Sequence, residues 1–251
     1  MSLGVGTDTD LARAIATEAG ALLLDLRTDS GLSGAALGDR GDRLADDLIL
    51  AWLRAARPDD CILSEETLDD RARCAARRVW VIDPLDGTRD YADGLDGWAV
   101  HVGLAVDGVA VLGAVAVPML GRVWASGDPA PAPPPAPARL RLVTSRTRSS
   151  KVVTRVAASL DAELIAMGSA GAKAMAVVDG RADIYLHTGG MYQWDSCAPV
   201  AVARAAGLHA SRVDGTPLVY NAAEALLPDL LICRTELADA VLAAVRAAGG
   251  V

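Results

Sequence analysis

Two aspartates that directly follow an apolar run are the clearest candidates for chemistry in this sequence. Asp83 comes after residues 79–82, and Asp86 lies three positions later, before Gly87 and Thr88. Carboxylates that leave one strand end can share a hard cation, because such cations prefer oxygen ligands. Gly87 lets the backbone turn tightly, and the free amides at a following helix start can face an anion. This run therefore predicts a site for a cation and a phosphate group.

Four further acidic side chains are candidates for the same site. Glu65 and Glu66 follow a short predicted strand, and two adjacent carboxylates repel each other unless a cation lies between them. Asp195 and Asp42 each stand at the predicted start of a helix, where the helix dipole favours an acidic residue in any protein. Each signal is modest alone, and it is their combination with the aspartate pair that indicates a metal site.

The spacing of these residues excludes several other kinds of phosphatase site. A haloacid-dehalogenase site needs its aspartates two residues apart, whereas Asp83 and Asp86 are three apart. A cysteine phosphatase needs five residues between its cysteine and arginine, but six separate Cys197 from Arg204. An EF-hand loop that begins at Asp86 would need glycine at its sixth position and glutamate at its twelfth, but these positions are Tyr91 and Gly97. The chain also has no Walker Gly-Lys-Ser/Thr sequence.

Charge and cysteine content narrow the class of partner. The formal net charge of −8 argues against binding to a nucleic acid polymer. It does not argue against a small phosphorylated metabolite as the partner, because a local metal cluster can outweigh the overall charge. The cysteines form no C-x-x-C pair, so we expect reduced core residues in a cytoplasmic protein, at positions 61, 74, 197 and 233. The first helical stretch carries several charges and predicts no membrane span.

The hydrophobic pattern predicts the elements that would position these residues. Helices are expected over 8–27, 42–57, 150–160, 170–178, 194–206 and 236–248. Strands are expected over 61–64, 79–82, 98–106, 109–117, 122–125, 141–144, 164–166, 183–186 and 230–233. The Gly- and Ser-rich stretch 30–41 is expected to be a loop.

A Pro/Ala-rich segment at 128–138 predicts a loop or linker between two domains. The N-terminal α+β domain, 1–127, would carry most of the metal ligands, and the C-terminal α/β domain, 139–251, would complete the site. Strands and helices alternate in the second half, which predicts largely parallel strand neighbours. Ligands in such sheets bind beyond the carboxyl ends of the strands.

Three motifs occur in the order typical of one enzyme superfamily: Glu65-Glu66, the run from Asp83 to Thr88, and Trp194-Asp195. On these motifs the chain resembles the inositol monophosphatase superfamily over nearly its whole length. The resemblance implies an α/β (α+β) fold, the layered αβαβα sandwich of the inositol monophosphatase and fructose bisphosphatase type. Within the superfamily the chain most resembles the bisphosphate nucleotidases of the CysQ type, especially the actinobacterial ones. Further segments that carry this likeness are 41–43, 63–66, 168–173, 194–199 and 214–221.

The resemblance also implies a set of metal ligands for two to three Mg²⁺ ions. Glu65, Asp83 and the Leu85 carbonyl would hold the first ion. Asp83, Asp86 and Asp195 would hold the second, and Glu65 would contribute to a looser third. Glu66 would support these ligands without binding a metal. Lithium inhibition is a further expectation from the family.

The same resemblance implies the catalytic and substrate-binding residues. Thr88, paired with Asp42, would orient and deprotonate the attacking water, so that no covalent intermediate is needed. The amides of Gly87 and Thr88 would cradle the phosphate. The other expected substrate contacts are Ser169, Lys173, Asp195, Ser145 and Arg148.

The expected reaction removes the 3′-phosphate of 3′-phosphoadenosine 5′-phosphate and yields AMP and phosphate. Inositol monophosphatases usually carry an inositol-binding acidic residue before Trp194, and segment 187–193 contains none. Inositol 1-phosphate or fructose 1,6-bisphosphate is the alternative substrate. A non-catalytic protein that binds phosphorylated metabolites is a second alternative. A homodimer is expected on base rates alone.

Overall fold

The computed structural model describes residues 6–129, 137–146 and 150–250. Its described α-helices are α1 (Asp8–Asp29), α2 (Gly34–Ala56), α3 (Thr88–Ala92), α4 (Lys151–Ser159), α5 (Ala170–Val178), α6 (Gln193–Ala205) and α7 (Ala238–Ala247). The first sheet contains β1 (Cys61–Ser64), β2 (Arg78–Asp86), β3 (Ala99–Val106), β4 (Val109–Val117) and β5 (Arg122–Ala125). The second contains β6 (Arg141–Ser145), β7 (Glu163–Met167), β8 (Ile184–Tyr192), β9 (His209–Ser211) and β10 (Leu226–Cys233).

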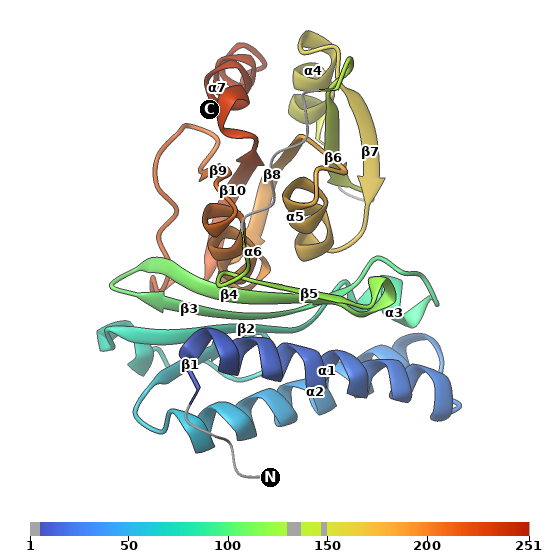
Figure 1. Cartoon of the computed structure of the whole chain (residues 1–251), viewed down its shortest axis with the longest axis vertical. Coiled ribbons are helices and arrows are strands. Elements are labelled where there is room, and N and C mark those ends of the chain that lie inside the picture. Colours follow the sequence, from blue (N-terminus) through green and yellow to red (C-terminus); the bar gives the residue numbers. More distant parts are fainter. Residues whose placement is uncertain (1–5, 130–136, 147–149, 251) are drawn as a thin grey trace.

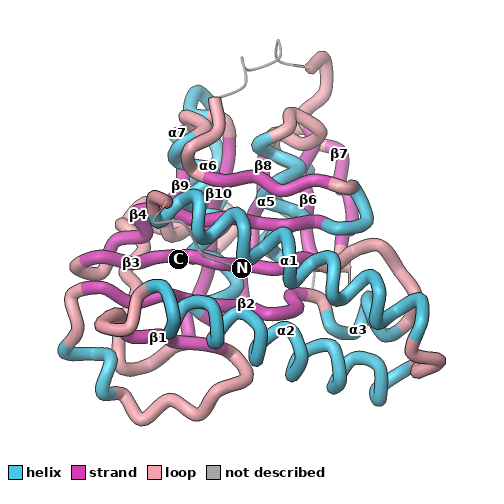
Figure 2. The backbone as a smooth tube through the Cα atoms, turned by 60° about the horizontal axis from the view of Figure 1, so that its bottom comes forward, coloured by secondary structure: helices cyan, strands magenta, loops and turns pink. Residues whose placement is uncertain are grey.

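The elements stack in five alternating layers, as Figure 1 shows. Helices α1 and α2 run side by side and cover one face of the first sheet (Figures 1 and 2). Helices α5 and α6 pack against the other face and separate it from the second sheet, and α4 and α7 lie beyond that sheet. This arrangement is the αβαβα sandwich that the sequence resemblance implied.

Strand β2 is buried on both faces because it separates two hydrophobic cores. Trp80 and Ile82 point toward helices α1 and α2, whereas Val79 and Val81 join the core that includes Cys197 of α6. Alternate side chains of a strand point to opposite faces, so an apolar run is what this position requires. The core that contains Val79, Val81 and Cys197 combines residues from both halves of the chain. A third core lies between the second sheet and the outer helices.

The second sheet is mixed, not largely parallel as predicted. Its order is β7-β6-β8-β10-β9, in which β6 pairs in parallel with β7 and β8. Strand β10 pairs antiparallel with both β8 and β9. The prediction failed because long loops precede β10 and let the chain reverse, and because the short strand β9 was missed.

Two other predictions from sequence were wrong. The stretch 34–41 belongs to α2 and is not a loop, so Asp42 lies within this helix and does not start it. Cys74 is exposed, whereas Cys197 and Cys233 are buried core residues; the four cysteines are free. In the order of the chain, the predicted connector at 128–138 comes after the last strand of the first sheet and before the first strand of the second. Its residues 130–136 lie outside the described part of the chain.

None of the helices in the described segments combines the length and the apolar character needed to cross a membrane.

Candidate active site

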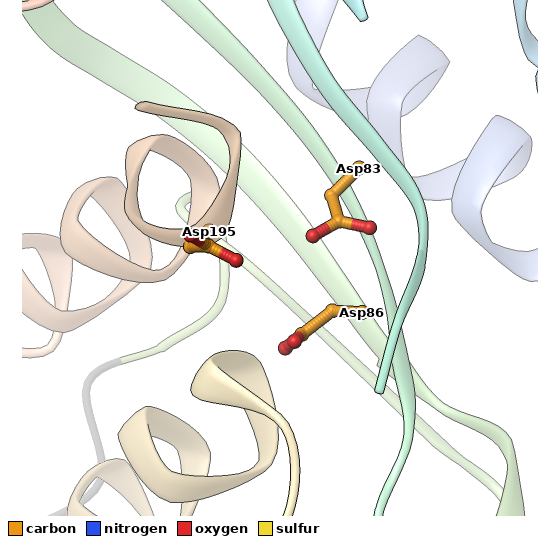
Figure 3. Close-up of side chains that lie close together, drawn as sticks. All are labelled: Asp83, Asp86 and Asp195. Carbon is orange, nitrogen blue, oxygen red and sulfur yellow. The ribbon is translucent and has the colours of Figure 1, made fainter. Parts of the chain in front are cut away.

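The end of β2 turns both of its aspartates toward one side of the sheet. Residues three apart in a regular strand point to opposite faces. Between Asp83 and Asp86, however, the pairing with β3 shifts: Asp83 lies opposite His101, and Asp86 lies opposite Ala99. This irregularity re-aims one side chain, as bulges near active sites do. Figure 3 shows the two carboxylates facing the same space.

Asp195 approaches the same space from the start of α6. Its Oδ2 accepts a hydrogen bond of 2.6 Å from the Tyr192 amide at the start of the helix, which fixes the carboxylate. Each of Asp83, Asp86 and Asp195 offers an oxygen that lies within 4.8 Å of the others (Figure 3). We call these three residues the aspartate triad.

The aspartate triad fits a divalent cation. Asp83 is almost fully buried, and its Oδ2 has no hydrogen-bond partner among the described residues. Burial raises the pKa of Asp83 well above its ordinary value, and the neighbouring charges of Asp86 and Glu65 raise it further. An unpaired buried carboxylate beside other carboxylates is unfavourable. A cation bound between them would offset both costs, and carboxylate oxygens suit Mg²⁺.

Asp86 is held by several donors on one oxygen. Its Oδ2 accepts hydrogen bonds from Ser169 Oγ at 2.5 Å and from the Gly171 amide at 2.8 Å. Nε2 of His101 lies 3.2 Å from the same oxygen. Burial would raise the pKa of Asp86, but the charge of His101 and the other contacts outweigh it and lower the pKa to about 2. Ser169, predicted as a substrate contact, therefore holds a triad carboxylate.

Sequence reasoning missed His101. It lies in the middle of β3 and is completely buried. Burial opposes its protonation, but the negative charge of Asp86 raises the pKa of His101 overall. A single histidine within an otherwise apolar strand was the signal that could have identified it.

Glu65 lies beside the aspartate triad but is not one of its three closely spaced members. It lines the same cavity from the turn after β1. Loss of hydration in the cleft raises the pKa of Glu65 to about 7, and the charges of Asp195 and Asp42 contribute to this shift. Glu66 follows it as an exposed side chain.

A buried carboxylate that sequence reasoning missed fixes the turn that carries these glutamates. Asp46 of α2 accepts a hydrogen bond of 2.5 Å from Ser64 Oγ and one of 3.0 Å from Thr67 Oγ1. Because these two residues flank Glu65 in the chain, Asp46 ties the turn to the helix that also carries Asp42.

Thr88 and Asp42 lie side by side, as the sequence resemblance implied. Thr88 Oγ1 is 3.3 Å from Asp42 Oδ1 and 3.0 Å from the Leu85 carbonyl oxygen. The hydroxyl has one proton and can donate to only one of these acceptors at a time. Burial raises the pKa of Asp42 to about 7, and the charge of Glu66 adds to the shift. A carboxylate with this pKa suits general base chemistry near neutral pH.

Gly87 joins β2 to the short helix α3 in a conformation that favours glycine. Its φ is +95°, and a β-carbon there would lie 2.6 Å from the Gly97 carbonyl oxygen. Any larger residue would displace Thr88, which follows directly.

A cavity of about 590 Å³ extends from the aspartate triad toward the second sheet. Lys173 lines it as a buried side chain whose Nζ donates to the Ser169 carbonyl at 2.5 Å. Ser145 also lines the cavity, whereas Arg148 lies outside the described residues. Further residues that line it and were not predicted as site residues are Arg89, Asp90, Arg146, Gly168, Ala170, Tyr185, His187 and Met191.

The segment before Trp194 contributes to this cavity without a carboxylate. His187 and Met191 belong to β8 and line the wall, and His187 Nε2 lies 2.8 Å from the Gly190 carbonyl oxygen. Gln193 points away into the core, where its Oε1 accepts a hydrogen bond from the Asn221 amide. The sequence lacks an inositol-binding acid in this segment, and the corresponding wall of the cavity, formed by His187 and Met191, carries no carboxylate.

A model of the inositol monophosphatase family matches residues 9–249. The chain belongs to this family. Membership confirms the resemblance inferred from the motifs, and it confirms the enzyme class, a metal-dependent phosphatase.

Similar proteins within the family are bisphosphate phosphatases. The chain is 48% identical to a 3′-phosphoadenosine 5′-phosphate phosphatase of Mycobacterium leprae, with 96% of this chain and 94% of that protein covered. It is 30% identical to the 3′(2′),5′-bisphosphate nucleotidase CysQ of Escherichia coli, over 74% of this chain and 80% of that protein.

Solved structures agree on the fold. CysQ of Bacteroides thetaiotaomicron, a bacterial member of the family, superposes with a TM-score of 0.78 at 25% identity and covers 91% of this chain and 97% of that one. An inositol monophosphatase of Thermotoga maritima gives a TM-score of 0.77 at 20% identity, and the match covers 96% of this chain and 97% of that one. At this low identity the second likeness concerns the fold alone.

Proposed function

We propose that this phosphatase removes the 3′-phosphate of 3′-phosphoadenosine 5′-phosphate and releases AMP and inorganic phosphate. The support from comparison is the 48% identity, over almost the whole chain, to a protein named for this activity. We also propose two to three Mg²⁺ ions as the cofactor, because the donors that meet at the aspartate triad are carboxylate oxygens.

The observation that carries the choice of substrate is that acidic and basic side chains line one cavity. The aspartate triad and Glu65 line it, and cations and the reacting phosphate would bind beside them. Lys173, Arg89 and Arg146 line the same cavity, and Arg146 pairs there with Asp90. A substrate with two phosphates can place one beside the cations and the other beside these basic side chains, whereas a monophosphate would use only the first of these contacts.

The side chains support direct hydrolysis by water. The bound cations would supply positive charge that favours loss of a proton from water and stabilises the leaving oxygen. Thr88 would orient the water, and Asp42 would accept its proton while the water oxygen bonds to phosphorus. The bond from phosphorus to the 3′-oxygen would break in the same step, and the 3′-oxygen would take up a proton from a solvent water to give AMP. Cys197 is a poor rival nucleophile, because burial raises the pKa of its thiol.

Inositol 1-phosphate and fructose 1,6-bisphosphate remain the alternative substrates. The wall formed by His187 and Met191 offers no carboxylate for sugar or inositol hydroxyls, which favours a nucleotide. Lithium sensitivity, a cytoplasmic location and a homodimer remain proposals.

The deciding experiment compares kcat/KM for the three candidate substrates at one Mg²⁺ concentration, with release of inorganic phosphate as the measurement. We expect 3′-phosphoadenosine 5′-phosphate to exceed each rival by about 100-fold or more, because buried polar groups that lose their partners discriminate strongly. A higher value for inositol 1-phosphate or fructose 1,6-bisphosphate would overturn the substrate assignment. Tight binding of the nucleotide without phosphate release would revive the non-catalytic alternative.

A further inference from the structure

His101 occupies a closed position between two of the elements that carry the aspartate triad. It belongs to β3, has no exposed surface, and lies opposite Asp83 in the pairing of β2 with β3. The reaction proposed above uses no atom of this side chain. A fully buried histidine therefore needs another explanation.

Each ring nitrogen contacts a different part of the metal site. Nδ1 lies 3.1 Å from the carbonyl oxygen of Trp194, the residue directly before Asp195. A carbonyl can only accept, so Nδ1 carries a proton and donates it. Nε2 lies 3.2 Å from Asp86 Oδ2, which is close enough for an ion pair when the ring is protonated, but the atoms are not aligned as a hydrogen bond. The imidazole thus spans the gap between the start of α6 and the end of β2.

The backbone of α5 packs directly against the imidazole ring. A β-carbon on Gly171 would lie 2.1 Å from Nε2, so the close approach of α5 depends on glycine at this position. The Gly171 amide and Ser169 Oγ donate to the same Asp86 oxygen that Nε2 approaches. Three groups from two elements and the turn before α5 therefore approach Oδ2 of Asp86.

We propose that His101 is a positioning residue that fixes Asp86 relative to Asp195, so that the carboxylate oxygens that meet at the aspartate triad are held at the separation a divalent cation requires. Buried groups that hydrogen-bond to metal ligands typically contribute 10-fold to 100-fold in metal affinity. This inference rests on the metal site of the phosphatase and not on the identity of its substrate.

The test measures binding of Mn²⁺ alone by isothermal titration calorimetry, with the full chain and no substrate present. We expect His101→Leu, which keeps the bulk of the side chain but removes both nitrogens, to weaken Mn²⁺ binding by about 10-fold or more. His101→Gln restores an amide that can reach Asp86, and we expect it to recover part of the affinity. Thermal unfolding in EDTA checks that each variant is folded.

His209→Gln is the matched control. His209 lies in β9, where its Nε2 contacts Ser211 Oγ at 2.8 Å, and this variant should bind Mn²⁺ as the wild type does. Unchanged affinity in His101→Leu would overturn the proposal. Equal losses of Mn²⁺ affinity in the Leu and Gln variants would also overturn it, because they would show that the ring acts only by filling space in the core. If the Leu variant does not fold, His101→Asn, which keeps the donor to Trp194, must show the weakened binding.

Discussion

Gly38 of α2 lies so close to Thr88 that a β-carbon at position 38 would come within 2.9 Å of the Thr88 methyl group. The helix can approach the end of β2 this closely only where it has no side chain. This contact brings Asp42, one turn further along α2, to the hydroxyl of Thr88. Helix packing thus sets the distance between the two residues proposed to activate water.

Gly38→Ala should therefore reduce activity more than stability. The added methyl group forces Thr88 to rotate, which moves its hydroxyl away from Asp42, whereas alanine within a helix is favourable by about 0.5–1 kcal/mol over glycine. We expect kcat to fall about 10-fold to 100-fold, the typical cost of misplacing a catalytic group. Phosphate release and urea unfolding measure the two effects.

A double variant provides the control for this prediction. If Gly38→Ala acts through Thr88, then adding it to Thr88→Ala should cause little further loss of kcat, because the hydroxyl is already gone. Losses that multiply in the double variant would contradict the mechanism.

The same contact shows why part of the fold could not be predicted from sequence. The glycines at 34, 38 and 41 indicated a loop, because glycine weakens isolated helices. In the folded protein Gly38 and Gly41 face Thr88 and Tyr91, and tertiary packing outweighs their low helix propensity. The apolar strand β4 needed no such context and was predicted with its observed bounds, whereas only residues 79–82 of β2 were predicted as strand.

The residues of the candidate site also form two groups: those that a sequence motif marks and those that only the folded structure reveals. Asp83, Asp86 and Asp195 were predicted because short motifs carry them, and the structure brings them together. His101 and Asp46 were missed because no motif marks them; their roles depend on strand register and on the packing of α2. Arg146 was also missed, because it pairs at 3.1 Å with Asp90 of α3, a residue far from it in the sequence.

Asp83→Asn should abolish turnover in saturating Mg²⁺ and yet stabilise the protein when metal is absent. The amide oxygen can still accept from the Leu85 amide, as Asp83 Oδ1 does at 3.2 Å. Burial and the neighbouring carboxylates raise the pKa of Asp83, so its ionised form costs free energy in the metal-free protein. Thermal unfolding in EDTA should show a higher Tm for the variant, and added Mg²⁺ should raise Tm less than in the wild type.

The control for the metal site is Asp93→Asn, which changes an exposed aspartate just after α3. It should retain both activity and the Mg²⁺-dependent rise in Tm. Full activity in Asp83→Asn would refute the assignment of the aspartate triad as the metal site.

Lys173→Met should reduce the preference for a substrate with two phosphates. The relevant comparison is kcat/KM for 3′-phosphoadenosine 5′-phosphate against that for adenosine 3′-phosphate, which lacks the second phosphate. A hydrogen bond to a charged group is worth about 1.5–3 kcal/mol, so the preference should fall by about 10-fold or more. Lys151→Met, at the exposed start of α4, is the matched control and should leave the preference intact. An unchanged preference in Lys173→Met would show that another group binds the second phosphate.

Asp60 should make the protein sensitive to acid through its contacts with β2. Its carboxylate accepts hydrogen bonds from Arg78 at 2.8 and 2.9 Å and from Trp80 Nε1 at 2.9 Å. The hydrogen bonds from Arg78 lower the pKa of Asp60 below its ordinary value of 3.8, although partial burial opposes the shift. A lowered folded-state pKa means that the unfolded chain binds protons first as the pH falls. The stability that Asp60 contributes is therefore complete above about pH 4–5 and is lost as the pH falls through the lowered pKa.

Urea unfolding between pH 7 and pH 2.5 tests this prediction. Asp60→Asn should be less stable than the wild type at pH 7, and the difference in unfolding free energy should shrink below about pH 4, where the carboxylate of the unfolded wild-type chain takes up a proton before that of the folded protein. Asp59→Asn changes the exposed neighbour and should follow the wild-type curve. A difference that stays constant down to pH 2.5 would show that Asp60 stabilises the fold through its shape and not through its charge, because only the charged form has a pH-dependent advantage.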